Sequence, residues 1–193
     1  MHGAELAMLA YYYFDSREPN KQDLYGLLSS LLYQFSAQLD SYLDILSKLY
    51  SDCVSGTRKP SNSAASACLT DMLKLPGQCH IYIIVDALDE CPASNLSGGT
   101  PAREEVLEFI KEVVDLKIPN VHVCVASRPE IDVMKFLQPL NPLEISLHDE
   151  VGQKDDVAKY IKLAVHSYSE TKRWNNEDTK LIIDTLSKNV NNT

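Results

Sequence analysis

The sequence predicts a three-layer α/β protein in which helices flank a mostly parallel sheet. Short apolar runs of strand length alternate along the chain with segments whose apolar residues recur at three- and four-residue steps. Residues 81–85 are apolar without a break, which is typical of a central parallel strand covered on both faces. The 193 residues are 45% hydrophobic and 23% charged, which is ordinary globular composition and enough for one domain with a core.

Each element follows from a local pattern. Strands are indicated by apolar and β-branched runs that end at polar or turn residues, and helices by leucines and valines on one helical face. The expected strands are 8–15, 81–85, 121–127 and a weaker one at 143–147. The expected helices are 24–39, with 43–50 as a second helix or an extension, then 64–75, 106–114, 156–166 and 178–187.

Bulk properties exclude several classes of protein. The formal net charge is −9 and no basic stripe interrupts it, which argues against a nucleic-acid partner. No apolar run approaches the roughly 20 residues that a membrane span needs, and the N-terminus lacks the basic region of a secretory signal. We therefore expect a cytoplasmic protein without a membrane partner.

The cysteines and histidines predict no metal site. The five cysteines are odd in number and never form a C-x-x-C pair, so we interpret them as reduced structural thiols. The five histidines are scattered, with none at metal-ligand spacing. His80 and His122 each begin an apolar run, which indicates residues at strand edges.

Polar side chains follow three of the expected strands. Asp86, Asp89 and Glu90 come after residues 81–85, while Ser127 and Arg128 come after the next strand. Residues 15–17, Asp-Ser-Arg, stand in the same position after the first strand. Ligands of parallel sheets bind beyond the carboxyl ends of the strands. Acids that hold a hydrated cation and arginines that neutralise phosphate fit a magnesium–phosphate site there.

At this point the sequence resembles a known family. "IYIIVDALDECP" is similar to the Walker B segment of NACHT proteins, which are P-loop NTPases of the STAND class. "VHVCVASRPE" resembles the following sensor strand, and "LAYYYFDSRE" the strand before, as found in fungal NACHT and nephrocystin-like proteins. The resemblance implies a fold of the P-loop NTPase type. It implies a partial NACHT-like domain over residues 1–165 and the start of a helical segment over 166–193.

The resemblance also implies roles at the matching positions. Asp86 would hold Mg²⁺, mainly through water, for ATP or GTP. Asp89 or Glu90 would complete the acidic site and help to position the attacking water. Arg128, beside Ser127 in the sensor motif, would sense the terminal phosphate. Other readings stay open: Asp86 as a turn cap, Asp89 as a loop start, and Arg128 paired with Glu130 or Glu144.

One part of the family's site is missing from these residues. A P-loop requires G-x-x-x-x-G-K-[ST], yet none of the seven glycines precedes a lysine. The sequence therefore predicts an incomplete sheet that lacks the strand and loop of Walker A. We expect a partial NACHT-type signalling module with little or no NTP hydrolysis alone. It would meet its nucleotide in a longer parent protein, alongside other domains or signalling partners.

Two alternatives remain open. The first is a complete NTPase in a longer gene product that acts as an ATP- or GTP-driven switch. The second is a non-enzymatic interaction fragment. A metal phosphohydrolase without a P-loop would need a nucleophile or a second metal cluster, and the loops after the strands show neither.

Overall fold

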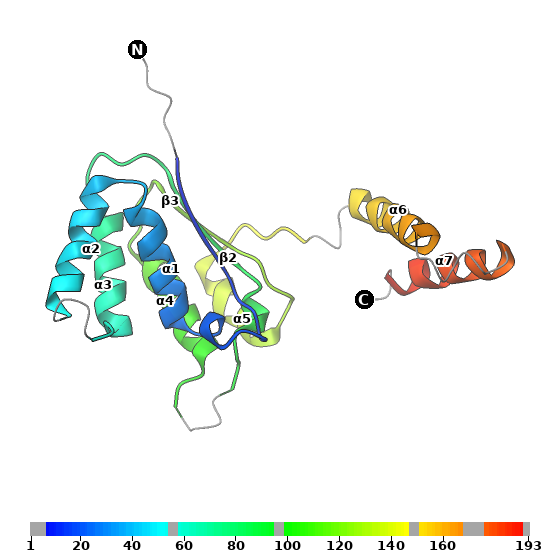
Figure 1. Cartoon of the computed structure of the whole chain (residues 1–193), viewed down its shortest axis with the longest axis horizontal. Coiled ribbons are helices and arrows are strands. Elements are labelled where there is room, and N and C mark those ends of the chain that lie inside the picture. Colours follow the sequence, from blue (N-terminus) through cyan, green and yellow to red (C-terminus); the bar gives the residue numbers. More distant parts are fainter. Residues whose placement is uncertain (1–6, 54–57, 95–98, 147–150, 168–175, 191–193) are drawn as a thin grey trace, which may run out of the picture. The chain divides into compact units, whose positions relative to one another are not determined.

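The computed structural model describes residues 7–53, 58–94, 99–146, 151–167 and 176–190 (Figure 1). The chain divides into two compact units, Met1–Pro142 and Leu143–Thr193, which are described separately. The boundary at residue 165 expected from the family resemblance stays a prediction.

The first unit contains a parallel sheet of three strands. These are β1 (Met8–Tyr13), β2 (Ile81–Asp86) and β3 (Val121–Val125), in the spatial order β1-β2-β3. Their register sets Tyr13 opposite Asp86 and Val85 opposite Val125, so the carboxyl ends of all three strands meet at one edge. The predicted α/β class is confirmed, and the three-stranded parallel sheet is consistent with an incomplete fold of the P-loop type.

Five helices accompany these strands in the described residues of the first unit. They are α1 (Leu24–Ser36), α2 (Asp40–Asp52), α3 (Asn62–Leu73), α4 (Ala102–Asp115) and α5 (Ile131–Leu137), with single 3-10 turns η1 (Pro19–Lys21), η2 (Leu88–Glu90) and η3 (Gln138–Leu140). Two helices begin at side-chain caps: Asp23 accepts a hydrogen bond from the Gly26 N–H, and Ser61 accepts one from the Ala64 N–H. Residues 43–50 thus belong to a separate helix, α2, rather than to an extension of α1.

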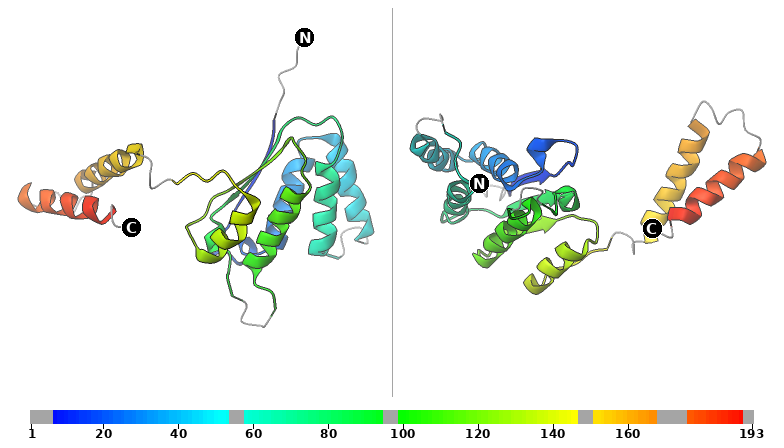
Figure 2. Two further views of the ribbon diagram at one scale, coloured as in Figure 1. Left: turned by 180° about the vertical axis from the view of Figure 1, so that it is seen from behind. Right: turned by 90° about the horizontal axis from the view of Figure 1, so that it is seen from below.

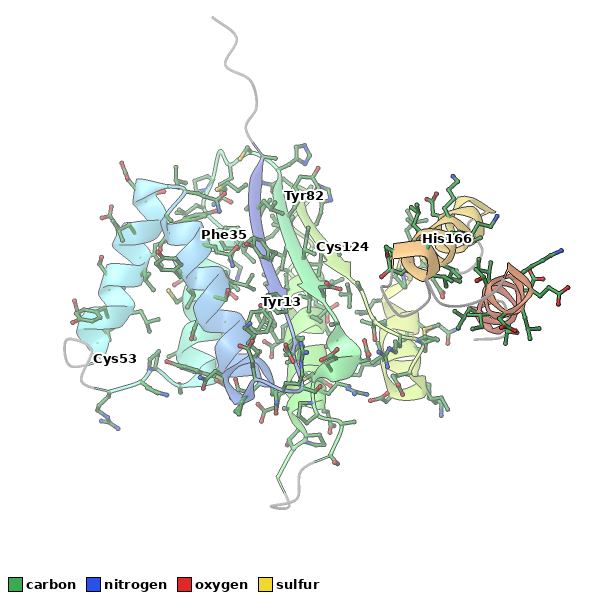
Figure 3. All side chains as sticks on the ribbon, turned by 45° about the vertical axis from the view of Figure 1, so that its right-hand side comes forward. Tyr13, Phe35, Cys53, Tyr82, Cys124 and His166 are labelled. Atoms are coloured by element: carbon green, nitrogen blue, oxygen red, sulfur yellow. The ribbon has the colours of Figure 1, made fainter. Side chains whose placement is uncertain are left out.

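The core of the first unit lies on one face of the sheet. Alternate strand residues such as Ala10 and Ile83 are buried there against the leucine face of α1, and Phe35 closes the α1 end of the same cluster. Figures 1 and 2 show α1, α3 and α4 together on this side of the strands. In Figure 3, Phe35 points into this layer, whereas Tyr82 and Cys124 lie on the opposite face.

The opposite face of the sheet is open in the described part of the first unit. Tyr11 is 57% exposed and Tyr82 is 42% exposed. The strand at 81–85 is central, as predicted, but the expectation that both of its faces are covered is wrong here. Right-handed crossovers from β1 to β2 and from β2 to β3 run in the same direction, so they carry their helices to the same face.

A fourth predicted strand does not form. Residues 143–146 have no regular structure, and Leu143 is 91% exposed; residue 147 lies outside the described residues. The alternation of apolar and polar residues in "LEISL" satisfies the strand pattern. A strand also needs a neighbouring backbone to pair with, and no ladder of the sheet includes these residues.

The described residues of the second unit form two helices, α6 (Val151–Ser167) and α7 (Asn176–Val190), which pack against each other. Both were predicted, and Ile161 and Val165 supply buried apolar side chains of α6. None of the helices in the described part of the chain has the length and apolar character that a membrane span requires.

Candidate functional site

Asp86 ends β2 at the carboxyl edge of the sheet. The chain turns sharply after it, because Ala87 adopts a left-handed conformation with φ of 53°. The Ala87 N–H donates a hydrogen bond to Asp86 Oδ1 at 2.8 Å, so this carboxylate also caps its own turn. Asp86 is exposed, which leaves its carboxylate accessible from solvent.

The next two acids lie on η2, and they point in different directions. Buried Leu88 holds this turn against the sheet, and its N–H donates to the carbonyl oxygen of Ala126 at 3.1 Å. Glu90 turns toward the loop after β1. There its Oε2 accepts hydrogen bonds from the backbone N–H of Ser16 at 2.9 Å and from the Ser16 hydroxyl at 3.1 Å.

Asp89 turns the other way, toward the loop after β3. The backbone N–H of Arg128 donates to Asp89 Oδ1 at 3.1 Å, and Arg128 Nε lies 3.4 Å from Asp89 Oδ2. Arg128 therefore pairs with Asp89 rather than with Glu130, while Glu144 belongs to the other unit. The Arg128 side chain is 79% exposed, and the neighbouring Ser127 hydroxyl donates to the Arg128 carbonyl oxygen at 2.8 Å.

Arg103, which the sequence analysis missed, holds this loop in place. It is a buried charged residue at the start of α4. Its guanidinium donates to the carbonyl oxygens of Asp89 and Cys91 and forms an ion pair with Asp132 at 3.0 Å. Arg103 thus ties η2 to α5. The available signal was an arginine in "PAREE", where the first helical turn is otherwise acidic.

The loop after β1 carries a third ion pair, which is closer than the other two. Asp15 is buried and accepts hydrogen bonds from Arg17 Nε at 2.9 Å and from Arg17 Nη2 at 2.8 Å. These bonds lower the pKa of Asp15 from 3.8 to about 2. Nearby, hydrogen bonds to Tyr13 and Glu18 raise the pKa of Lys21 to about 12. Asp15 and Arg17 therefore stay charged at neutral pH.

The acids do not converge on a ready-made metal cage. Within the described residues, no group of three or more histidine, cysteine, aspartate or glutamate side chains is placed to hold a metal ion. Asp89 is engaged by Arg128 and Glu90 by Ser16, which leaves Asp86 as the accessible carboxylate. This donor set still fits Mg²⁺, because Mg²⁺ keeps several waters and takes only one or two carboxylates together with phosphate oxygens.

The fold and the polar residues at the carboxyl ends of its strands define the class of the protein. It is a parallel α/β module whose polar residues gather at the carboxyl ends of its strands, where such sheets bind ligands. The family model described as nephrocystin 3, N-terminal, matches residues 2–128, and the chain belongs to this family. The predicted resemblance to nephrocystin-like N-terminal domains of NACHT type is confirmed. Searches of curated proteins and of solved structures each found no match.

Proposed function

We propose that this chain supplies the magnesium- and phosphate-sensing half of a NACHT-type nucleotide-binding signalling module, with little or no hydrolysis of its own. The observation that carries the proposal is the junction of η2 with the loop after β3. There the Asp89–Arg128 pair stands beside Asp86 at the carboxyl edge of the sheet. Family membership supports the NACHT association of this module.

Asp86 is the proposed magnesium residue. Its exposed carboxylate accepts one bond from its own turn and retains further lone pairs. A hydrated Mg²⁺ could be held through water at this position, with the phosphates of ATP or GTP completing its coordination. Magnesium would supply neutralisation of the phosphate charge.

Arg128 and Ser127 are the proposed phosphate sensors. The ion pair leaves most of the Arg128 side chain exposed. Among the described residues, no group forms a hydrogen bond or ion pair with its Nη atoms. A terminal phosphate would compete with Asp89 for the guanidinium, since arginine binds phosphate oxygens with paired hydrogen bonds. Breaking the Asp89–Arg128 pair would couple nucleotide binding to the position of the loop after β3.

Glu90 and Asp89 are the proposed catalytic acids of the complete site. Two hydrogen bonds from Ser16 to Glu90 Oε2 hold this carboxylate toward the loop after β1, and its Oε1 would be the atom that positions a water molecule in the complete site. These 193 residues contain no glycine–lysine loop to cradle phosphates. Hydrolysis would therefore need that loop from elsewhere in a longer parent protein.

Calorimetric titration of the 193-residue chain with Mg·ATP and Mg·GTP tests this proposal. We expect weak, magnesium-dependent binding without turnover, abolished by Asp86→Ala and weakened by Arg128→Met. Asp71→Ala removes an exposed carboxylate on α3 and serves as the matched control. Micromolar affinity of the wild type, or measurable turnover, would contradict the claim that the site is only half present. Binding that Asp86→Ala leaves unchanged would contradict the magnesium role of Asp86.

The open face of the sheet favours a second candidate, a non-enzymatic interaction module. Tyr11, Tyr13 and Tyr82 are exposed on it, and such apolar surface is typical of a contact with another protein domain. If neither nucleotide binds at millimolar concentration, this candidate replaces the first.

A further inference from the structure

Two histidines far apart in the sequence meet at the amino-terminal end of the sheet. Nδ1 of His80 lies 3.0 Å from Nε2 of His122, and both residues are exposed. The ring centroids are 5.2 Å apart and the ring planes differ by 20°. Tyr82 stacks on the His122 ring at 4.9 Å, which restricts that ring. Two imidazole nitrogens thus face each other in a partly ordered, solvent-accessible position.

Strand pairing creates this juxtaposition. Tyr82 is the register partner of His122, so His80, two residues earlier, lies diagonally across from it. The loop before β2 is fastened to the start of β3, because the Ile81 N–H donates to the Asn120 carbonyl oxygen and the Asn120 side chain donates to the Cys79 carbonyl oxygen, each at 2.8 Å. The backbones that carry the two histidines are therefore held together before any ligand arrives.

The nitrogen separation suits a shared metal ion. Imidazole nitrogens bind zinc at about 2.0–2.1 Å, so two of them at angles of about 90–109° stand about 2.8–3.4 Å apart. The observed 3.0 Å falls within this range. Without metal, the two nitrogens share one hydrogen bond. For both nitrogens to bind the metal, each neutral ring must carry its single N–H on its other nitrogen. One of the two rings therefore changes its tautomer, and neither ring changes its charge.

We propose that His80 and His122 form a binding site for a divalent transition metal of the zinc class, with water in the remaining positions. Imidazole is a preferred ligand of zinc, copper and nickel. The site would clip the start of β2 to the start of β3. It is separate from the acids after β2, because the six steps from His80 to Asp86 span about 20 Å at about 3.3 Å per residue.

A neighbouring thiol must be separated from this site in any test. Cys124 is an exposed free cysteine on β3, on the same face of the sheet as His122. A thiolate binds zinc by itself. The experiment therefore needs Cys124→Ser as well as the histidine variants.

Calorimetric titration of the full 193-residue chain with zinc chloride tests the proposal. We expect one zinc per chain in the wild type and in Cys124→Ser. Affinity should fall by at least about tenfold in His80→Gln and in His122→Gln, since even loss of an outer-shell partner costs that much. His166→Gln, an exposed histidine of α6, is the matched control and should bind as the wild type does.

Two readings would overturn the site: unchanged zinc affinity in either histidine variant, or loss of binding in Cys124→Ser. The imidazole NMR signals of the wild type provide a measurement that does not depend on whether any variant folds. Those of His80 and His122 should shift together on addition of zinc, and zinc should raise the melting temperature of the wild type. Signals that stay in place would equally contradict the proposal.

Discussion

The two outer strands of the sheet, β1 and β3, differ in how their outward-facing backbone groups are satisfied. At the β1 edge, the Gln34 side-chain amide accepts from the Tyr11 N–H at 3.1 Å and donates to the Tyr11 carbonyl oxygen at 2.7 Å. Gln38 makes the same pair of bonds to Leu9, at 3.2 and 2.8 Å. At the β3 edge, the alternation of the parallel ladder directs the N–H and C=O groups of Val123 and Val125 away from β2, and no described residue is recorded as capping them.

The difference shows how a helix can complete the edge of a sheet. Gln34 lies in the last part of α1 and Gln38 in the turn that follows it, and the two side chains match alternate residues of β1, Tyr11 and Leu9. The C-terminal end of α1 and the turn after it thus satisfy backbone groups that would otherwise be a template for association. Near the β3 side, the buried Arg103 links η2 to α5 but caps no backbone group of β3.

Replacing Arg103 should have the largest effect, because it would remove the buried link from η2 to α5. Arg103→Met leaves the carbonyl oxygens of Asp89 and Cys91 without their buried donor. We expect the free energy of unfolding to fall by about 3 kcal/mol, measured by urea denaturation. Lys111→Met on the exposed side of α4 is the control and should stay within about 0.5 kcal/mol of the wild type. Equal losses in both variants would refute the anchoring role of Arg103.

A substitution at Gly26 of α1, beside Tyr12 of β1, should have the second-largest effect. A Cβ added there would lie 2.5 Å from the Asn20 carbonyl oxygen and 2.6 Å from the Tyr12 hydroxyl. Alanine is ordinarily the better helix former by about 1 kcal/mol. We nevertheless expect Gly26→Ala to lower the free energy of unfolding by about 2 kcal/mol through overpacking.

Ser29→Ala, at an exposed position of the same helix, provides the comparison for Gly26→Ala and should be neutral or slightly stabilising. Both free energies come from urea denaturation. Stabilisation by Gly26→Ala would mean that Asn20 and Tyr12 move aside freely.

Removing a glutamine cap should make the β1 edge resemble the β3 edge. Glutamate at position 34 keeps the acceptor but cannot donate to the Tyr11 carbonyl oxygen. We expect Gln34→Glu to lower the free energy of unfolding by about 1 kcal/mol and to increase self-association in sedimentation velocity. Ser29→Glu adds the same charge to α1 without touching the edge. If that control behaves like Gln34→Glu, the effect belongs to the charge and not to the cap.

The Asp15–Arg17 pair should add a pH dependence to the β1 side. The pKa of Asp15 is lowered from 3.8 to about 2 by hydrogen bonds from Arg17, so the folded state favours the ionised carboxylate. Its contribution is present above the ordinary pKa and is lost as the pH falls through the folded one. The stability difference between the wild type and Asp15→Asn should shrink from pH 3.8 to about pH 2. Urea denaturation across this window measures it, and a constant difference would count against the pair.

Local pattern was sufficient for most elements of the fold. The strands at 8–15, 81–85 and 121–127 and all helices except α5 were expected from periodicity, since apolar spacing reflects the burial of one face of an element. α5 was missed because its seven residues are too few to show that period. The strand expected at 143–147 failed for the opposite reason: it has the pattern but no partner in the sheet.

The sequence by itself determined which residues stand at the strand ends, because Asp86, Asp89, Glu90, Ser127 and Arg128 directly follow apolar strands. Their family motif could also be recognised there. Only the tertiary structure decided how they pair. The coupling of Asp89 to Arg128, of Glu90 to Ser16 and of His80 to His122 depends on strand order and register, which join residues about 40 to 75 positions apart. The open sheet face was decided in the same way, by the direction of the crossovers.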